Sequence, residues 1–314
     1  MKVYDVIIIG AGPAGLSAGI YAGRAMLDAL IIEKMQDGGQ IVQTADIENY
    51  PGSNPEESGP TLIDRMTAQV KKFGVEKVYD TVTEVSLDGN IKTVVCSKES
   101  YQAKTVIISG GAASKSIGCK GEDEFLGRGI SHCATCDAPF FRGFAVYVIG
   151  GGDAALEEAL YLTKFAKKVT VIHRRRILRA AKSVQDKVFR NDKIEFMYDT
   201  VVREVKGDGI IESMVVENVK NGTVTEIKAD PNDGTFGLFV FIGYQPMTET
   251  YQGKLKLSEN GYIITDEDMK TNIPGVFAAG DIRQKSLRQV VTAAADGAIA
   301  AVQAEKYIEE SKTE

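Results

Sequence analysis

The sequence predicts an α/β protein with two Rossmann-like dinucleotide-binding folds. A glycine-rich turn follows a short apolar strand and opens a helix at residues 10–15, and the same arrangement returns at residues 150–155. The chain of 314 residues is also longer than one hydrophobic core usually supports, so two domains are expected.

Composition and charge exclude several classes of protein. A hydrophobic content of 44% and a charged content of 25% are those of a soluble globular protein. The net charge of −6 offers no basic surface to nucleic acid or to an anionic membrane. The apolar run at residues 6–9 is only strand-length, so neither a signal peptide nor a membrane span is expected. Four cysteines do not make a secreted disulfide scaffold, and Cys96 and Cys119 stand alone, so a reducing cytoplasm fits best.

The expected elements follow from apolar periodicity and glycine turns. The two strand–helix–strand units are predicted at residues 4–9, 10–25 and 29–33, and at residues 144–149, 153–165 and 169–172. Short β-rich runs follow the units, at residues 82–85 and 201–205, and the alanine-rich run 288–308 predicts a long C-terminal helix. Domain boundaries are expected in short loops near residues 113–121 and 243–248.

The first glycine-rich turn has the sequence context of a nucleotide site. Gly10 allows the tight turn, Gly12 lets a pyrophosphate approach the backbone, and Gly15 lets helix and strand pack closely. Pro13 and Ala14 begin a helix whose free N–H groups and dipole attract phosphates. Glu33 ends the second strand, where a carboxylate accepts hydrogen bonds from ribose hydroxyls.

A second segment points to the same site from the other end of the chain. The run 275–281 predicts a strand that delivers Asp281 to a sharp turn after Gly280. It resembles the segment with which FAD-binding proteins of the two-dinucleotide-fold class hold the ribityl chain. An aspartate that merely caps the turn is the alternative. Paired with the first fingerprint, this segment predicts an FAD site assembled from both ends of the chain.

The second glycine-rich turn predicts a site for NADPH rather than NADH. Its nucleotide-binding residues are Gly150, Gly152, Asp153 and Ala154. The following strand ends in His173, Arg174, Arg175 and Arg176, with Arg179 one turn on, and not in an acid. Guanidinium groups bind a 2′-phosphate that a carboxylate would repel. A solvated basic turn is the alternative, and His173 is expected to be structural or ribose-adjacent.

Cys133 and Cys136 form a Cys-x-x-Cys pair just before the second nucleotide fold. This spacing permits reversible disulfide chemistry and lowers the pKa of one thiol. A zinc site is disfavoured because zinc needs four ligands and only His132 lies nearby, so no metal is expected. An incidental pair of small core residues is a further alternative. Asp137 can exchange the proton of the dithiol, or it can simply cap its loop.

With these residues together, the chain resembles the low-molecular-weight thioredoxin reductases nearly end to end. The segments that carry the resemblance are residues 38–40, 48–52, 131–137, 150–158, 173–180, 243–246 and 280–293. The resemblance implies further FAD contacts at Gly39, Gln40, Asn49, Arg288, Gln289 and Val290. Residues 138–139, residues 109–112 and Arg176 depart from the commonest family pattern, which leaves partner specificity more open than the reaction.

The resemblance also implies an architecture and a reaction. An FAD domain of residues 1–113 and 245–314 is interrupted by an NADPH domain of residues 114–244 that carries the dithiol. Electrons pass from NADPH through FAD and the Cys133–Cys136 disulfide to oxidised thioredoxin, as in a thioredoxin-disulfide reductase. Cys136 is then the flavin-facing sulfur, and Cys133 attacks thioredoxin. The family further implies two domains that rotate against each other and a cytoplasmic homodimer.

Other acceptors and one other class of protein stay open as alternatives. The flavoprotein partner of a peroxiredoxin is disfavoured by the arginines and because the chain starts at its FAD strand. The ferredoxin-linked type lacks the arginine cluster. A small-molecule dithiol oxidase would turn over with oxygen and without a protein partner. A nucleotide sensor without turnover is disfavoured because it has no use for a reactive dithiol.

Overall fold

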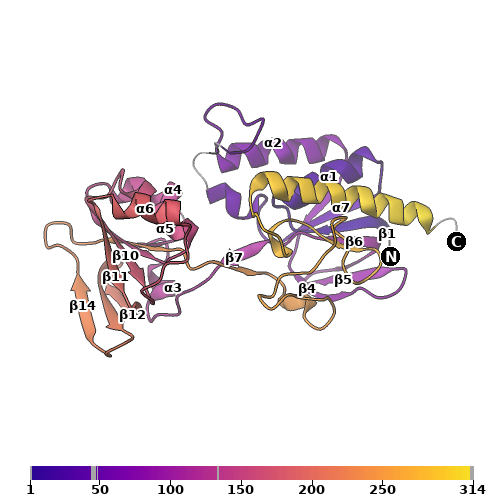
Figure 1. Cartoon of the computed structure of the whole chain (residues 1–314). Helices are drawn as coiled ribbons and strands as arrows, with labels where there is room; N and C mark the ends of the chain where they lie inside the picture. Colours follow the sequence, from indigo (N-terminus) through magenta and orange to yellow (C-terminus); the bar gives the residue numbers. More distant parts are fainter. Residues whose placement is uncertain (1, 44–46, 48, 133, 312–314) are drawn as a thin grey trace. The chain divides into compact units, whose positions relative to one another are not determined.

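The computed structural model describes residues 2–43, 47, 49–132 and 134–311 (Figure 1). The chain forms two compact units: Met1–Ala113 with Gln245–Glu314, hereafter the first unit, and Ser114–Tyr244, the second unit. Strands β7 (Ala112–Ser114) and β16 (Tyr244–Pro246) pair as a two-stranded sheet and contain both points at which the chain passes from one unit to the other.

The first unit is built on a seven-stranded sheet. Its order is β3 (Glu76–Tyr79), β2 (Ala29–Glu33), β1 (Val3–Ile9), β6 (Ser100–Ile108), β5 (Lys92–Cys96) and β4 (Val82–Ser86), with β17 (Val276–Ala278) also on β6. Strands β1, β2, β3, β6 and β17 pair in parallel, whereas β4 and β5 are antiparallel. The carboxyl ends of β1, β2, β6 and β17 therefore meet at one edge, where ligands of open α/β sheets bind.

Alternation along β1 divides the first unit into two cores. Val6 and Ile8 face the core shared with α1 (Pro13–Arg24), α2 (Gly59–Lys72) and α7 (Val290–Glu310), which is the long yellow helix of Figure 1. Ile7 and Ile9 face the opposite core, together with Tyr251. Helix α1 packs against both α2 and α7. The predicted first strand–helix–strand unit and the predicted C-terminal helix are confirmed.

The second unit repeats the plan with a five-stranded parallel sheet. Its order is β11 (Ile194–Tyr198), β10 (Lys168–His173), β9 (Ala145–Ile149), β15 (Gly237–Val240) and β8 (Ile130–Ser131). One face carries α5 (Asp153–Leu162) and α6 (Lys182–Phe189), and the other carries the antiparallel strands β12 (Thr200–Gly207), β13 (Ile211–Asn218) and β14 (Val224–Lys228). The predicted second unit and the α/β fold with two Rossmann-like folds are thus confirmed.

One predicted boundary is wrong by three residues. The helix predicted to run to residue 165 ends at Leu162. Thr163 follows it, and its hydroxyl donates to the carbonyl oxygen of Leu160 at 2.7 Å, a local hydrogen bond that competes with continuing the helix. The remaining helical segments are short: η1 (Gly39–Gln43), α3 (Glu122–Phe125), α4 (Ala134–Asp137), η2 (Ala138–Phe141), η3 (Glu249–Tyr251) and η4 (Gly280–Ile282). Among the described helices, none is long and apolar enough to span a membrane.

Candidate functional site

The glycine turn after β1 is packed tightly on its inner side. Gly10 has a φ of +103°, a conformation that favours glycine, and its N–H donates to the carbonyl oxygen of Ile32 at 2.8 Å. A Cβ there would lie 2.6 Å from the carbonyl oxygen of Ser109, whose hydroxyl donates to Ile9. A Cβ at Gly15 would overlap the carbonyl oxygen of Gly10. These glycines therefore let α1 approach the sheet closely.

The outer side of the same turn is open. Gly12 is the N-cap of α1, and Pro13 and Ala14 begin the helix. Within the described part of the chain, a Cβ at Gly12 would meet nothing nearer than the Gly38 carbonyl oxygen at 3.8 Å. A Cβ at Gly39 would likewise lie 3.8 Å from the Cα of Gly12. The two loops leave a cradle in which a phosphate can approach the free N–H groups at the start of α1.

Glu33 holds the glycine turn as well as marking the end of β2. Its Oε2 accepts a hydrogen bond from the Ala11 N–H at 2.7 Å. Its Oε1 accepts the N–H groups of Lys34 at 2.7 Å and Met35 at 3.2 Å. Because each carboxylate oxygen has two acceptor sites, Glu33 keeps capacity for a ribose hydroxyl beside these backbone bonds.

The turn after β17 lies directly beside the start of α1. Gly280 has a φ of +78°, and a Cβ there would lie 2.8 Å from the Cβ of Ala14. In the described chain, Asp281 Oδ1 and Arg288 Nε are buried without a hydrogen-bond partner. The Arg288 guanidinium lies 4.0 Å from the centre of the Tyr262 ring. Buried polar atoms normally have partners, so these two atoms fit a site completed by a ligand.

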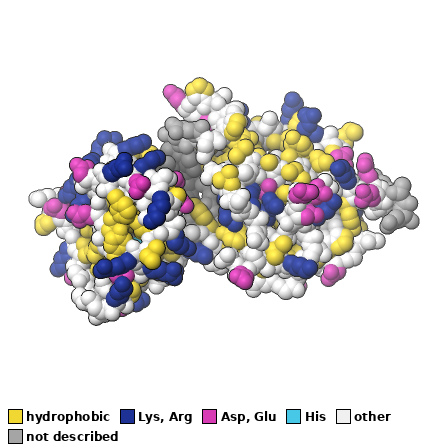
Figure 2. All heavy atoms as spheres, in the orientation of Figure 1, with side chains coloured by type: hydrophobic (Ala, Val, Ile, Leu, Met, Phe, Trp, Pro, Cys, Tyr) yellow, Lys and Arg dark blue, Asp and Glu magenta, His cyan; other side chains and the backbone are white. Residues whose placement is uncertain are grey.

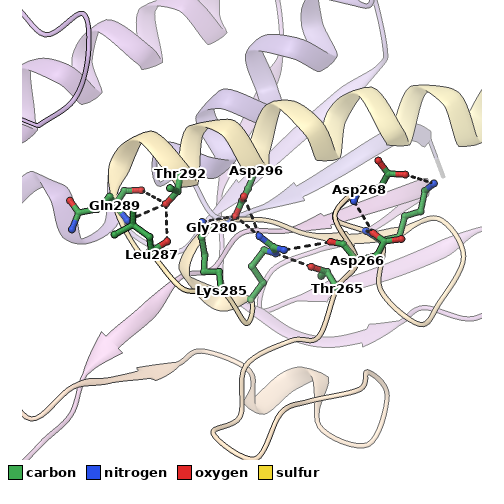
Figure 3. Close-up of polar contacts among 11 residues, drawn as sticks. Thr265, Asp266, Asp268, Gly280, Lys285, Leu287, Gln289, Thr292 and Asp296 are labelled. Carbon is green, nitrogen blue, oxygen red and sulfur yellow. Dashed lines mark hydrogen bonds and ion pairs between the residues drawn. The ribbon is translucent and has the colours of Figure 1, made fainter. Parts of the chain in front are cut away.

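The first turn of α7 is tied to the N-terminal part of the chain. Gln289 is the N-cap, and its N–H donates to the hydroxyl of Thr292 at 3.2 Å (Figure 3). The side-chain amide of Asn49 donates to Gln289 Oε1 at 2.9 Å. The side-chain amide of Gln40 donates to a backbone carbonyl of β7. These contacts place Gln40, Asn49, Gln289 and Val290 in the same unit as the cradle.

A buried charge cluster lies behind the Gly280 turn. Asp296 of α7 accepts the Gly280 N–H at 3.0 Å and the Lys285 ammonium at 2.7 Å, as Figure 3 shows. Arg283 Nη1 lies 3.2 Å from Asp296 Oδ1, and Arg283 Nε donates to the Thr265 hydroxyl at 2.8 Å. The side chains of Lys285 and Asp296 are each 8% exposed. No sequence motif pointed to this cluster.

The glycine turn of the second unit has the same division into a packed and an open side. A Cβ at Gly150 would lie 2.5 Å from the Cβ of Ala155, so this glycine allows close packing of α5. A Cβ at Gly152, the N-cap of α5, would meet no described atom within 4 Å. Asp153 and Ala154 begin the helix and are exposed. The open side again suits a phosphate at a helix N-terminus.

The loop after β10 is anchored on this glycine turn. The N–H of Arg179 donates to the Gly151 carbonyl oxygen at 2.7 Å, and the N–H of Ala181 donates to Asp153 Oδ1 at 2.7 Å. A Cβ at Gly151 would overlap the ring of His173, which is 7% exposed. Burial lowers the pKa of His173, and the arginine charges add to this effect. His173 therefore packs against the glycine turn, and its role, predicted as structural or ribose-adjacent, stays a prediction.

An arginine-rich pocket of about 440 Å³ lies at the end of β10. It is lined by Arg174, Arg175, Arg176, Ile177, Arg179, Asp199, Val219 and Lys220. All four arginines are exposed, and lysine and arginine side chains, dark blue in Figure 2, are numerous on this unit. Asp199 pairs with Arg176 at 3.0 Å and with Lys220 at 3.3 Å. Asp199 and Lys220 were not expected from sequence.

Cys133 lies outside the described residues, and the side chain of Cys136 is not described either. Cys136 and Asp137 belong to α4, and Asp137 is half-buried at its end. Among the described residues, no group of three or more His, Cys, Asp or Glu side chains could hold a metal ion.

A family model described as pyridine nucleotide-disulphide oxidoreductase matches residues 4–297. The chain belongs to this oxidoreductase family. Its relatives in this family include bacterial thioredoxin reductases. That of Peptoclostridium litorale is 60% identical over 309 residues, which cover 98% of each chain. That of Peptoclostridium acidaminophilum is 58% identical over 308 residues, again 98% of each chain.

Solved structures agree with this assignment to the oxidoreductase family. The crystal structure of Lactococcus lactis thioredoxin reductase has a TM-score of 0.83 at 44% identity and covers 98% of this chain and 99% of that chain.

The functional-site residues that were not predicted from the sequence had weak local signals. Asp296 is an acid within an alanine-rich helix, and its lysine and arginine partners lie on the preceding loop. An acidic residue within a run of small residues is the sequence signal that could have identified Asp296 as a buried charge.

Proposed function

We propose that this protein is an NADPH-dependent flavoprotein disulfide reductase. It passes electrons from NADPH through FAD and the Cys133–Cys136 pair to oxidised thioredoxin. The observation that carries the proposal is the pair of glycine cradles in one chain, each open on its outer side, with a Cys-x-x-Cys just before the second. The thioredoxin reductases that are 60% and 58% identical over nearly the whole chain support thioredoxin as the acceptor.

The residues of the first unit suit FAD. Gly10, Gly12, Pro13, Ala14 and Gly15 would receive the pyrophosphate at the start of α1, with Glu33 toward the adenosine ribose. The buried and unpaired oxygen of Asp281 would accept ribityl hydroxyls. Gly39, Gln40, Asn49, Arg288, Gln289 and Val290 would complete the site. When bound, FAD would accept a hydride from a nicotinamide and pass electrons to a disulfide.

The start of α7 has a second task in this proposal. Its first-turn N–H groups have no partner within the helix and form the positive end of the helix dipole. Gln289 and Val290 would present them to the flavin edge that gains negative charge on reduction. The hydrogen bond from Asn49 to Gln289 fixes the N-cap side chain in this position.

The residues of the second unit suit NADPH. Gly150, Gly152, Asp153 and Ala154 would receive its pyrophosphate at the start of α5. Arg174, Arg175 and Arg179 would bind the 2′-phosphate with charge-assisted hydrogen bonds, and His173 supports the loop beneath. The arginine-lined pocket at the end of β10 supports NADPH over NADH.

The dithiol performs the exchange with thioredoxin. Cys133 as a thiolate would attack one sulfur of the thioredoxin disulfide, giving a mixed disulfide and releasing the other thioredoxin sulfur. Cys136 would then attack Cys133, which re-forms the Cys133–Cys136 disulfide and releases reduced thioredoxin. Asp137 would carry the proton that these steps take up or release. We further propose a cytoplasmic homodimer, on the family resemblance.

Substitution of the attacking cysteine tests the proposal. Cys133→Ser should retain FAD yet lose NADPH-dependent reduction of thioredoxin, because the mixed disulfide cannot form. Cys119→Ser is the matched control, since Cys119 is a half-buried free cysteine of the same unit, and it should keep wild-type turnover. Full thioredoxin reduction by Cys133→Ser would overturn the proposed role of the dithiol.

A further inference from the structure

The buried charges behind the Gly280 turn do not balance one another. Asp296 carries one negative charge, whereas Lys285 and Arg283 together carry two positive charges. Arg283 has a second acceptor in the Thr265 hydroxyl. For Lys285, Asp296 is the one acceptor found among the described residues. A buried ammonium is costly without an anionic partner, so Lys285 depends on Asp296.

A second carboxylate lies within electrostatic reach of Lys285. Burial raises the pKa of Asp281, and the positive charges of Lys285 and Arg288 oppose that rise. Asp281 Oδ1 has no hydrogen-bond partner within the described protein, and the Lys285 ammonium is bound to Asp296.

We propose that Asp296 is a positioning residue for the flavin site. It binds the Lys285 ammonium and thereby keeps this cation from pairing with Asp281, whose carboxylate stays free for the ribityl chain. This inference rests on the proposed function, since it takes Asp281 as the residue that receives FAD. Asp296 also fixes the turn itself through the Gly280 N–H, and the test must separate the two effects.

The charge of Asp296 and its hydrogen bond to the turn can be separated by measuring the rate of FAD release from the holoenzyme. The rise in flavin fluorescence reports this rate. Asp296→Asn keeps the shape and an acceptor for the Gly280 N–H but loses the charge. FAD release should become about tenfold faster or more, because Lys285 turns to Asp281. Adding Lys285→Met should return release to within about threefold of wild type, since the ammonium group that would turn to Asp281 is gone and Arg283 keeps its bond to the Thr265 hydroxyl.

A surface acid of the same unit provides the control. Asp268 pairs with Lys270 at 3.0 Å and accepts the side-chain amide of Gln303 from α7 at 2.9 Å. The side chains of the Asp268–Lys270 pair are 43% and 48% exposed, so loss of this ion pair should change stability little. Asp268→Asn should therefore release FAD at the wild-type rate.

Three results would overturn the inference. Asp296→Asn with wild-type FAD release would show that its charge has no role, and failure of Lys285→Met to rescue it would show that Asp296 acts through the turn alone. If Asp296→Asn does not fold, the rate of FAD release from Lys285→Met is compared with that from the double variant, which combines Lys285→Met with Asp296→Asn. The inference predicts equal release rates, and tenfold faster release by the double variant contradicts it. A wild-type protein without affinity for FAD would instead remove the proposed function, before any variant is made.

Discussion

Arg176 and Asp199, which both line the arginine-rich pocket, form an ion pair with Arg176 Nε 3.0 Å from Asp199 Oδ2. The Asp199 side chain is 6% exposed, and it also binds Lys220 at 3.3 Å. Arg176 therefore already has an anionic partner within the protein. We therefore expect an incoming 2′-phosphate to be bound by the guanidinium groups of Arg174, Arg175 and Arg179.

This difference predicts unequal effects of arginine substitutions. Arg174→Ala and Arg175→Ala should each raise the KM for NADPH about tenfold or more, because each removes a charge-assisted hydrogen bond. Arg176→Ala should raise it by less than about threefold. The KM for NADH, which lacks the 2′-phosphate, is the control and should stay unchanged. A larger effect at Arg176 than at Arg175 would contradict this assignment.

Alanine substitutions at two glycines of the first turn should affect different properties, stability in one case and FAD binding in the other. A Cβ at Gly15 would overlap the Gly10 carbonyl oxygen, so Gly15→Ala should destabilise the fold by about 1–3 kcal/mol. Gly12→Ala has room in the protein, so it should leave the melting temperature of the FAD-free protein unchanged while lowering FAD affinity. Thermal melting and flavin content after purification measure the two effects. A flavin-saturated Gly12→Ala protein would show that the cradle does not receive FAD.

The four cysteines should differ sharply in reactivity. Burial raises the pKa of Cys96 and of Cys119 to about 11, with nearby Asp80 and Glu122 adding to the effect. At about pH 8 such thiols are almost fully protonated, and the thiolate is the reactive form. Iodoacetamide should therefore modify Cys133 and Cys136 after reduction by NADPH and leave the other two unmodified. Mass spectrometry of the peptides checks this, and equally fast labelling of Cys119 would contradict it.

The Asp281 carboxylate should respond to pH in a defined direction. Burial raises its folded-state pKa above the ordinary value of about 4. The protonated carboxyl group therefore contributes to the stability of the folded state, and the charged carboxylate lowers that stability. The FAD-free protein should lose this stabilisation as pH rises through the raised pKa. Asp281→Asn should accordingly raise the melting temperature of FAD-free protein at neutral pH.

The same substitution should weaken FAD binding, because the amide accepts ribityl hydroxyls less well than the carboxylate. FAD affinity of the wild type should fall as pH decreases through the raised pKa, and that dependence should be absent in Asp281→Asn. Unchanged affinity and pH dependence in the variant would remove Asp281 from the flavin site.

The parts of the fold that the sequence predicted are those with local causes. Apolar runs of strand length, glycines at the turns and an alanine-rich tail are all signals within a few residues, and β2 (Ala29–Glu33) has the predicted bounds. The tail helix was predicted from residue 288 but begins at Val290, because Gln289 serves as its N-cap. Cap geometry depends on individual hydrogen bonds, which periodicity does not contain.

The features that were not predicted depend on contacts between distant residues. Glu33 was expected to face a ribose, yet its oxygens also accept three backbone N–H groups, one of them from Ala11 in the neighbouring turn. Asp296 looks like a solvated acid in the sequence and is instead buried against Lys285. The pairing of β1 with β2 brings Glu33 to Ala11, and the packing of α7 against β17 and the turn after it brings Asp296 to Lys285.

Anaerobic titration of the purified protein with NADPH, followed by oxidised thioredoxin, tests the central claim most directly. The visible absorbance of bound flavin should bleach with NADPH at far lower concentration than with NADH. It should recover when oxidised thioredoxin is added, because the dithiol passes the electrons on. Bleaching without recovery would contradict thioredoxin as the acceptor, and failure of NADPH to bleach the flavin would contradict the whole route from NADPH to the dithiol.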